Sequence, residues 1–361
     1  MPLGLNGTQG RFSESLSYGQ HYERHSVQAS DQDEAASFEP AVLSKVSRFG
    51  SAFYKFLRPY GLIQASISAV CLFARVLVEN PRLFKWSLLL KAFTGLIAIV
   101  LSRAYFIGIN QIYDADIDRV NKPNLPIPSG DISVKQAWFF VIFDLLAGLS
   151  ILRLMNADLI TTSLYCLGLF FATFYSVPPI RFKRSSFATS IGLPLTTGVI
   201  HNVGILYATI ASLGLQFSWS PSIVFIVTFA TLFFVTVSIA KDLTDVEGDM
   251  KHNIRTFPAI FGPRNSAFIC TGLLLVNYIG AIVAAIYMPQ KIRADRQSSF
   301  ISSSKAFKRH ILVPVHAVCA LWLLSQTRKL DKENYSQEAS ANFNESLWKL
   351  LNLEFLLFPF I

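Results

Sequence analysis

The stretch that decides the fold reads NQIYDADIDR at residues 110–119. It closes a long apolar segment, residues 86–109, which can cross a lipid bilayer as a single helix. Carboxylates at the end of such a helix are costly in lipid unless they serve a function. Asn110, Asp114 and Asp118 are spaced i, i+4, i+8, so a continuous helix places them on one side. The stretch therefore predicts a polar site at the end of a membrane helix.

A second acidic stretch, KDLTDVEGD at residues 241–249, closes another apolar segment. Asp242, Asp245 and Asp249 are spaced i, i+3, i+7, which predicts that they too share one helix face. Two carboxylate clusters at the ends of two membrane helices favour one shared site for divalent cations.

The composition is that of a membrane protein. The chain has 361 residues, of which 52% are hydrophobic and 15% are charged, whereas charged residues make up about 25% of a soluble domain. The net charge of +9 would suit a nucleic-acid partner. The basic residues instead lie in short loops between apolar segments, as in multi-pass membrane proteins, so no nucleic acid is expected.

The hydropathy pattern predicts an all-α, polytopic membrane domain over residues 45–361 with about nine transmembrane helices. Residues 1–44 are polar and are expected to be a disordered leader, either the remnant of an organellar transit peptide or a tail without a targeting role. The expected spans are 59–79, 86–110, 134–153, 157–177, 187–210, 220–240, 265–288, 310–326 and 345–361.

The two acidic clusters follow the second and the sixth span, so they are expected on the same side of the membrane. That side also carries the N-terminus. The excess of Lys and Arg in its loops favours the cytoplasmic or stromal side.

Carboxylate oxygens suit Mg²⁺, which keeps several waters and commonly bridges a protein to substrate phosphates. Two facing clusters therefore suit a diphosphate held through Mg²⁺, with an apolar helical barrel around an apolar tail. Basic side chains near the clusters are candidates to hold the remaining phosphate oxygens. They are Arg58, Arg119, Lys122, Arg181, Lys183 and Lys241.

Other interpretations explain less. A calcium-binding EF-hand loop fails because its sixth position is Arg119 rather than Gly and its twelfth is Leu125 rather than Glu. A DxD glycosyltransferase would explain the first cluster but not the second. An ion-coupled transporter would carry its acidic residues near the centres of the spans, whereas these clusters lie at the ends of spans.

The fifth span contains two polar residues, His201 and Asn202. They either contact a substrate or form hydrogen bonds between helices.

The two motifs resemble those of the UbiA superfamily of intramembrane prenyltransferases. The strings NQIYDADIDRVNKPNLPIPSGDIS at 110–133, YSVPPIRFKR at 175–184 and KDLTDVEGDMKHNIRTF at 241–257 are similar to its plant plastid branch. That branch contains homogentisate prenyltransferases and enzymes that prenylate flavonoids, coumarins and related phenolics.

The resemblance implies a nine-helix barrel with a central cavity and lateral access from lipid. It implies that Tyr175, Arg181 and Lys183 lie near the prenyl donor. It also implies catalytic roles for Asp114, Asp118, Asp242 and Asp245. The implied Mg²⁺ ligands are Asn110, Asp114, Asp118, Asp242, Asp245 and Asp249.

The expected function is Mg²⁺-dependent transfer of a prenyl group from an allylic diphosphate to the aromatic ring of a plant phenolic, in a plastid membrane. The alternative is phytyl or solanesyl transfer to homogentisate, for tocopherol or plastoquinone biosynthesis. Pro128 lies where homogentisate-type members carry Ala, which counts against this alternative.

Overall fold

The computed structural model describes residues 44–251, 253–287 and 309–361. It divides the chain into an N-terminal unit, residues 1–53, and a larger unit from Tyr54 to Ile361. In the first unit, the described residues 44–53 are helical. The expected leader lies outside the described residues, apart from residue 44.

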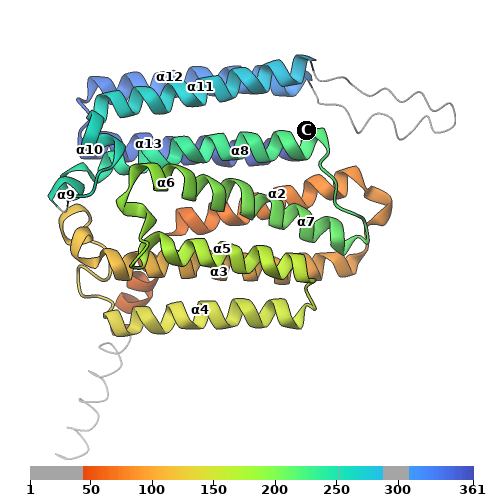
Figure 1. Ribbon diagram of the computed structural model, residues 1–361, viewed down its shortest axis with the longest axis horizontal. Coiled ribbons are helices and arrows are strands. Elements are labelled where there is room, and N and C mark those ends of the chain that lie inside the picture. The colour runs from red at the N-terminus through yellow and green to blue at the C-terminus, as the bar shows by residue number, and fades with distance from the viewer. Residues whose placement is uncertain (1–43, 252, 288–308) are drawn as a thin grey trace, which may run out of the picture. The chain divides into compact units, whose positions relative to one another are not determined.

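The larger unit is a bundle of long helices (Figure 1). Its described part contains no β-strand, which confirms the all-α prediction. The α-helices are α2 (Pro59–Glu79), α3 (Trp86–Asn121), α4 (Val134–Leu154), α5 (Leu159–Ser176), α6 (Ser186–Leu193), α7 (His201–Ser212), α8 (Pro221–Ala240), α9 (Val246–Lys251), α10 (Phe257–Phe261), α11 (Pro263–Tyr287), α12 (Arg309–Lys332) and α13 (Gln337–Leu357). The short helical turns are η1 (Pro81–Leu83), η2 (Phe182–Arg184), η3 (Pro194–Ile200), η4 (Lys241–Thr244) and η6 (Phe358–Phe360).

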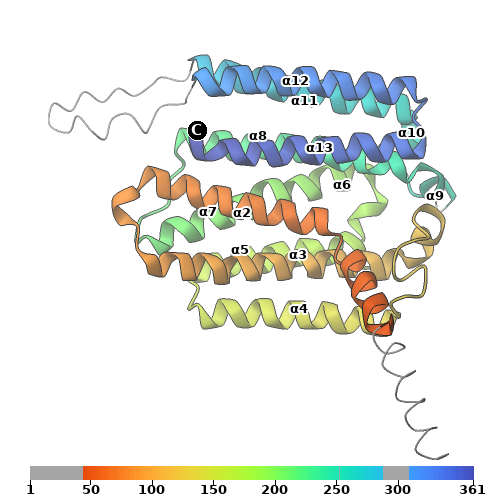
Figure 2. The ribbon, with the colours of Figure 1, turned by 180° about the vertical axis from the view of Figure 1, so that it is seen from behind.

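Within the described ranges, 8 helical stretches are long and apolar enough to cross a membrane. They correspond to the first eight expected spans. The ninth, expected at 345–361, falls on α13, which begins earlier, at Gln337, and is not among the eight. Figure 2 shows α13 beside α8, and it also contacts α2 and α12.

Local sequence explains where several helices begin. Ser133 and Gln136 form a capping box at the start of α4, and Asp158 accepts the Ile160 and Thr161 N–H groups at the start of α5. Ser220 caps α8 directly before Pro221, whose missing N–H costs nothing in the first turn. These caps separate the apolar runs into individual spans.

The fifth span is not one regular helix. It consists of α6, a π-helical segment at Pro194–Ile200, and α7. Pro194 cannot donate a backbone hydrogen bond, which favours irregular helix at this point. Asn202 is fully buried and donates to the carbonyls of Gly198, at 2.7 Å, and Thr197, at 3.3 Å. These two hydrogen bonds of Asn202 thus lie within its own span, whereas the sequence offered a substrate contact or a bond to another helix.

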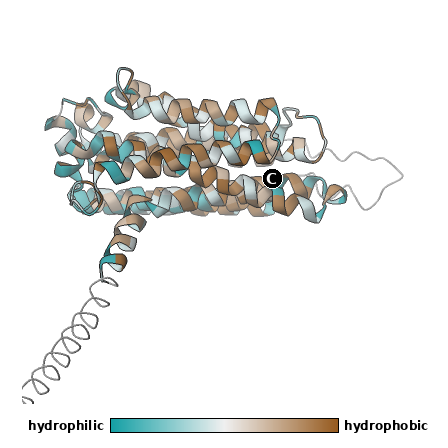
Figure 3. Ribbon diagram, turned by 90° about the horizontal axis from the view of Figure 1, so that it is seen from below, coloured by the Kyte–Doolittle hydropathy of each residue, from teal (hydrophilic) through white to brown (hydrophobic). Residues whose placement is uncertain are grey.

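The bundle is packed solidly on one side. Buried residues of α2, α7, α8, α11, α12 and α13 form one continuous apolar core, in which Phe233, Ala230 and Leu274 are completely buried. The opposite side, between α3, α5, η3 and α7, holds a cavity instead. The apolar outer faces of the helices are exposed, as lipid contact requires, and the hydrophilic residues gather at the end of the bundle that carries α9 (Figure 3).

Candidate active site

The first acidic cluster lies on the last turns of α3. The helix continues to Asn121 instead of ending near residue 110, so the i, i+4, i+8 spacing holds over the whole motif. Asn110 Nδ2 lies 2.8 Å from Asp114 Oδ2 and 3.2 Å from Ser176 Oγ. The Asn110 amide thereby orients the Asp114 carboxylate toward the end of α5.

Arg58 reaches the same cluster from the start of α2. Its Nη2 lies 3.4 Å from Asp118 Oδ2. Arg58 has left-handed backbone angles, φ 45° and ψ 72°, which bulky residues adopt only under constraint. Gln111 supplies one such constraint, because its side chain donates to the carbonyl of Phe56 at 2.6 Å.

Two cations from the loop after α5 approach Asp114. Lys183 forms an ion pair with Asp114 Oδ1, and Arg181 Nη2 lies 3.6 Å from the same oxygen. Arg181 also donates to the carbonyl of Tyr113 at 2.8 Å and has a left-handed φ of 40°. Burial lowers the pKa of Lys183 to about 8, although Asp114 opposes this shift. The loop thus holds two positive charges against one carboxylate.

The second acidic cluster does not lie on one continuous helix, contrary to the expectation of a single face. The 3₁₀ turn η4 ends at Thr244, and the next residue, Asp245, has a φ of −111° and a ψ of 5° that break the helix before α9. Lys241 forms an ion pair with Asp242, and Thr244 Oγ1 donates to Asp245 Oδ1 at 2.8 Å. Asp249 accepts a hydrogen bond from Thr256 at 3.1 Å.

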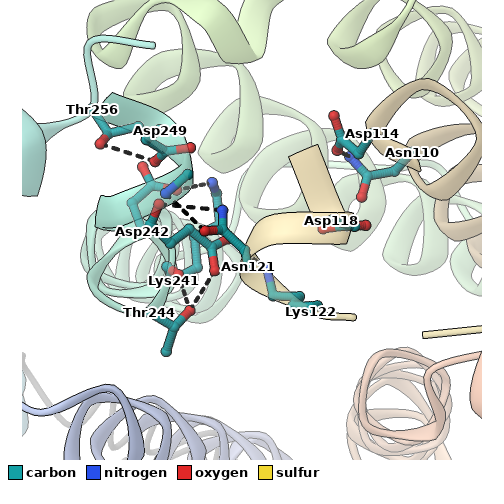
Figure 4. A network of polar contacts seen from close by, with 12 residues as sticks. Asn110, Asp114, Asp118, Asn121, Lys122, Lys241, Asp242, Thr244, Asp249 and Thr256 are labelled. Atoms are coloured by element: carbon teal, nitrogen blue, oxygen red, sulfur yellow. Dashed lines mark hydrogen bonds and ion pairs between the residues drawn. The ribbon is translucent and has the colours of Figure 1, made fainter. Parts of the chain in front are cut away.

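The two clusters meet at the end of α3 (Figure 4). Lys122 Nζ lies 2.5 Å from Asp245 Oδ2. Burial would raise the pKa of Asp245, but Lys122 and the bond from Thr244 hold it below its usual value. Burial, together with the nearby Asp242 and Asp245, raises the pKa of Asp249 to about 7. The second cluster therefore contains one carboxyl group with a lowered pKa, Asp245, and one with a raised pKa, Asp249.

One expected residue lies apart. Arg119 pairs with Asp116 at 2.6 Å, and 65% and 83% of their side-chain surfaces are exposed. Asp116 follows Asp114 by two residues and Arg119 follows Asp118 by one, so both side chains point to another side of α3 than Asp114 and Asp118. This geometry gives Arg119 no contact with the clusters.

An apolar cavity leads away from the clusters. Its volume is about 200 Å³, and Phe106, Tyr175 and Phe182 line the end nearest the aspartates. Tyr175 is buried beside the Lys241 ammonium. The far end reaches Gly95, 15 residues before Asn110 on α3, which corresponds to about 22 Å of helix. A second cavity, of about 630 Å³, shares wall residues including Gly95 and Met155, so the apolar space continues along the bundle.

The donor set fits Mg²⁺. Within the described residues, no group of three His, Cys, Asp or Glu side chains could hold an ion by itself. Mg²⁺ does not need such a cage, because it binds through one or two carboxylates together with waters and substrate phosphates. Asp114 and Asp118 on one side and Asp242, Asp245 and Asp249 on the other offer this kind of partial ligation.

The family follows from comparison with known proteins. Residues 67–350 match the model of the UbiA prenyltransferase family. The chain belongs to this family. A UbiA homolog from Archaeoglobus fulgidus, solved with DMAPP and Mg²⁺, has the same fold with a TM-score of 0.53 and 19% identity, over 82% of this chain and 98% of that one.

Plant relatives are more similar to this UbiA prenyltransferase. The chloroplastic homogentisate solanesyltransferase of Arabidopsis thaliana is 44% identical over 94% of this chain and 84% of its own length. The chloroplastic 2-acyl-4-prenylphloroglucinol 6-prenyltransferase of Humulus lupulus is 40% identical over 90% of this chain and 76% of its own length. Membership confirms the expectation of a membrane-bound prenyltransferase, and it gives no support to the transporter alternative.

In this UbiA member, four polar residues at or near the site were missed from sequence alone. Ser176, Asn121 and Thr256 bond to the clusters, and Asn121 carries a detectable signal, since it lies three residues after Asp118 on the same helix. Arg103 is the fourth and lines the cavity. Its one hydrogen-bond partner among the described side chains is Gln64, at 3.4 Å.

His201 also lines the cavity, and its Nε2 lies 2.8 Å from Ser68 Oγ on α2. It therefore combines the two alternatives from the sequence, because it joins two helices and borders the space open to a substrate.

Proposed function

We propose that the chain transfers a prenyl group from an allylic diphosphate to the aromatic ring of a plant phenolic, with Mg²⁺ as the cofactor, in a plastid membrane. The proposal rests on one observation. Two carboxylate clusters from distant parts of the chain, both paired with cations, meet where a long apolar cavity begins. A diphosphate with an apolar tail has the charge and shape for such a site.

Asn110, Asp114 and Asp118 would hold Mg²⁺ on one side of the diphosphate, and Asp242, Asp245 and Asp249 on the other. When bound, Mg²⁺ neutralises the charge of the diphosphate as it leaves. The cations already gathered here would bind the remaining phosphate oxygens. They are Arg58, Lys122, Arg181, Lys183 and Lys241.

In the reaction, the allylic C–O bond breaks and its electron pair leaves with the diphosphate. A pair of π electrons from the phenolic ring then forms the new C–C bond, and the ring loses a proton. The cavity keeps water from the allylic carbon, because its lining near the aspartates is largely aromatic. The released diphosphate can accept the proton.

The direct test uses membranes from cells that express the chain. We expect allylic diphosphates and phenolics to give a prenylated ring when Mg²⁺ is present. EDTA should abolish the product and added Mg²⁺ should restore it. Full turnover in EDTA-treated membranes would refute the role of the metal, and release of free prenyl alcohol with every phenolic would refute the acceptor class.

A second candidate acceptor is homogentisate, which is part of the name of the Arabidopsis relative, homogentisate solanesyltransferase. Arg103 favours it. A half-buried guanidinium on the wall of an apolar cavity, bonded to the neutral Gln64, can bind a carboxylate that enters the cavity. Homogentisate carries such a carboxylate, and a neutral flavonoid or coumarin does not.

The plastid assignment rests on the chloroplastic names of the plant relatives and on the apolar spans. The lipid would supply the solvent for both substrates. A fluorescent fusion of the full chain should label plastid envelopes or thylakoids, and labelling of the endoplasmic reticulum alone would contradict the assignment.

A further inference from the structure

Asn121, the last residue of α3, connects the two acidic clusters through its side chain. Its Oδ1 accepts the N–H of Gly248 at 2.9 Å, and its Nδ2 donates to the carbonyl of Asp245 at 3.2 Å. The side chain is buried, with 7% of the residue exposed. Figure 4 shows it between the first cluster and the second. A single amide therefore holds two backbone groups of the second cluster.

Gly248 makes this contact possible. A Cβ atom at this position would lie 2.3 Å from Asn121 Oδ1 and 2.5 Å from its Cγ, closer than real Cβ atoms approach. The residue needs no side chain because the amide of Asn121 occupies the space. Asp245 directly precedes α9 and Asp249 lies on it, so the two carboxylates flank this contact on either side of Gly248.

The backbone of Asn121 takes part as well. Its carbonyl accepts a hydrogen bond from Gln337 Nε2 at 3.2 Å, which joins the start of α13 to the same point. Lys122, the next residue, pairs with Asp245. Asn121 and Lys122 thus fix the second cluster in two ways. The hydrogen bonds of the Asn121 side chain are buried and directional. The Lys122–Asp245 ion pair is partly exposed and tolerates changes in geometry.

We propose that Asn121 is a positioning residue that holds the two acidic clusters at the separation needed to share one diphosphate. The proposal rests on the proposed function, because it concerns the same diphosphate site. Asn fits the position because its amide donates and accepts at once, whereas Asp has no donor and Leu, of similar size, has neither group. A displacement of about 1 Å at such a site is enough to reduce binding and rate strongly.

The experiment compares three variants of the full chain in detergent: Asn121→Ala, Gly248→Ala and the double variant. The readouts are the melting temperature and the stabilisation by Mg²⁺ with inorganic pyrophosphate, from which an apparent Kd is obtained. We expect Asn121→Ala to weaken pyrophosphate binding about tenfold or more through the lost hydrogen bonds. Gly248→Ala should weaken it at least as much through the clash.

In the double variant, the new Cβ fills the space left by the amide. We therefore expect its affinity to equal that of Asn121→Ala, without the further loss that two independent changes would give. Asn277→Ala and Gly272→Ala are the matched controls. Asn277 is also a buried amide that binds a backbone carbonyl of another helix, and Gly272 has open space around its Cβ position.

Asn277→Ala should lower the melting temperature and leave pyrophosphate affinity unchanged. The positioning role is overturned if Asn121→Ala keeps the wild-type affinity. It is also overturned if Asn121→Ala and Asn277→Ala both lose affinity in proportion to their loss of stability. Wild-type protein that is not stabilised by Mg²⁺ and pyrophosphate would overturn the diphosphate site itself, and the positioning role with it.

Discussion

Lys122 Nζ lies 2.5 Å from Asp245 Oδ2, across 123 residues of sequence. This ion pair joins the end of the first acidic motif to the centre of the second. Since each motif alone resembles a solvated loop, their contact is the feature that brings two helix ends together into one candidate site for the proposed diphosphate.

The carboxylates of the clusters should be essential, whereas a neighbouring carboxylate should not. Asp114→Asn and Asp245→Asn keep the shape of the side chain and remove its charge. Each should cost about 4 kcal/mol or more of transition-state stabilisation, roughly a thousandfold in rate. The loss should be equal for all phenolics, because every acceptor shares the same donor. The measurement is the initial rate with one donor and two phenolics.

Asp116→Asn is the control for this comparison. Asp116 belongs to the same motif, but it is 83% exposed and paired with Arg119. Its variant should retain a nearly normal rate. A severe loss at Asp116, or normal rates for both cluster variants, would contradict the assignment of the site.

Lys183 should set the alkaline limit of the reaction. Burial lowers its pKa to about 8, so its ammonium is present below this pH and is lost above it. If the ammonium binds the diphosphate, kcat/KM for the donor should fall as pH rises through about 8. Lys183→Arg keeps its charge at every accessible pH, so its alkaline limit should move up by about one unit or more. An unchanged limit in Lys183→Arg would exclude Lys183 as its cause.

Arg103 should discriminate between acceptors. Replacing it by Leu removes a charge-assisted hydrogen bond, which is worth about 1.5–3 kcal/mol or about 10- to 100-fold. If an acidic acceptor such as homogentisate binds there, its KM should rise by this factor while the KM of a neutral phenolic stays the same. Arg153→Leu, an exposed change on α4, should affect neither. Equal effects of Arg103→Leu on both acceptors would remove its role in acceptor choice.

The two acidic loops should open to the same side of the membrane. A cysteine at Ser129 and a cysteine at Lys251, both exposed near the clusters, should react with an impermeant maleimide from one face of sealed vesicles. A cysteine at Ser218, in the exposed loop before α8, should react from the other face. The background should lack Cys166, the exposed native cysteine. Labelling at 129 and 251 from opposite faces would rule out a shared site.

Much of the fold, and part of the candidate site, could be predicted from short-range sequence patterns. The apolar runs predict the first eight spans, because crossing a bilayer requires about twenty apolar residues in a helix. The i, i+4, i+8 spacing predicts that Asn110, Asp114 and Asp118 share a face, and α3 is indeed continuous through them. The same reasoning was wrong for the second motif, where the backbone turns at Asp245. Periodicity assumes an unbroken helix, and it contains no information on where a helix is interrupted.

Sequence by itself determined the residue types of the site, the helices that carry them and the end of the bundle where they gather. Tertiary structure alone decided their partners. It paired Lys183 with Asp114 and Lys122 with Asp245, left Arg119 exposed, and brought Asn121 against Gly248. These contacts join residues far apart in the chain, and helix packing sets their distances. Spacing within one helix fixes only which side a residue faces, so it cannot tell which distant residue will meet it there.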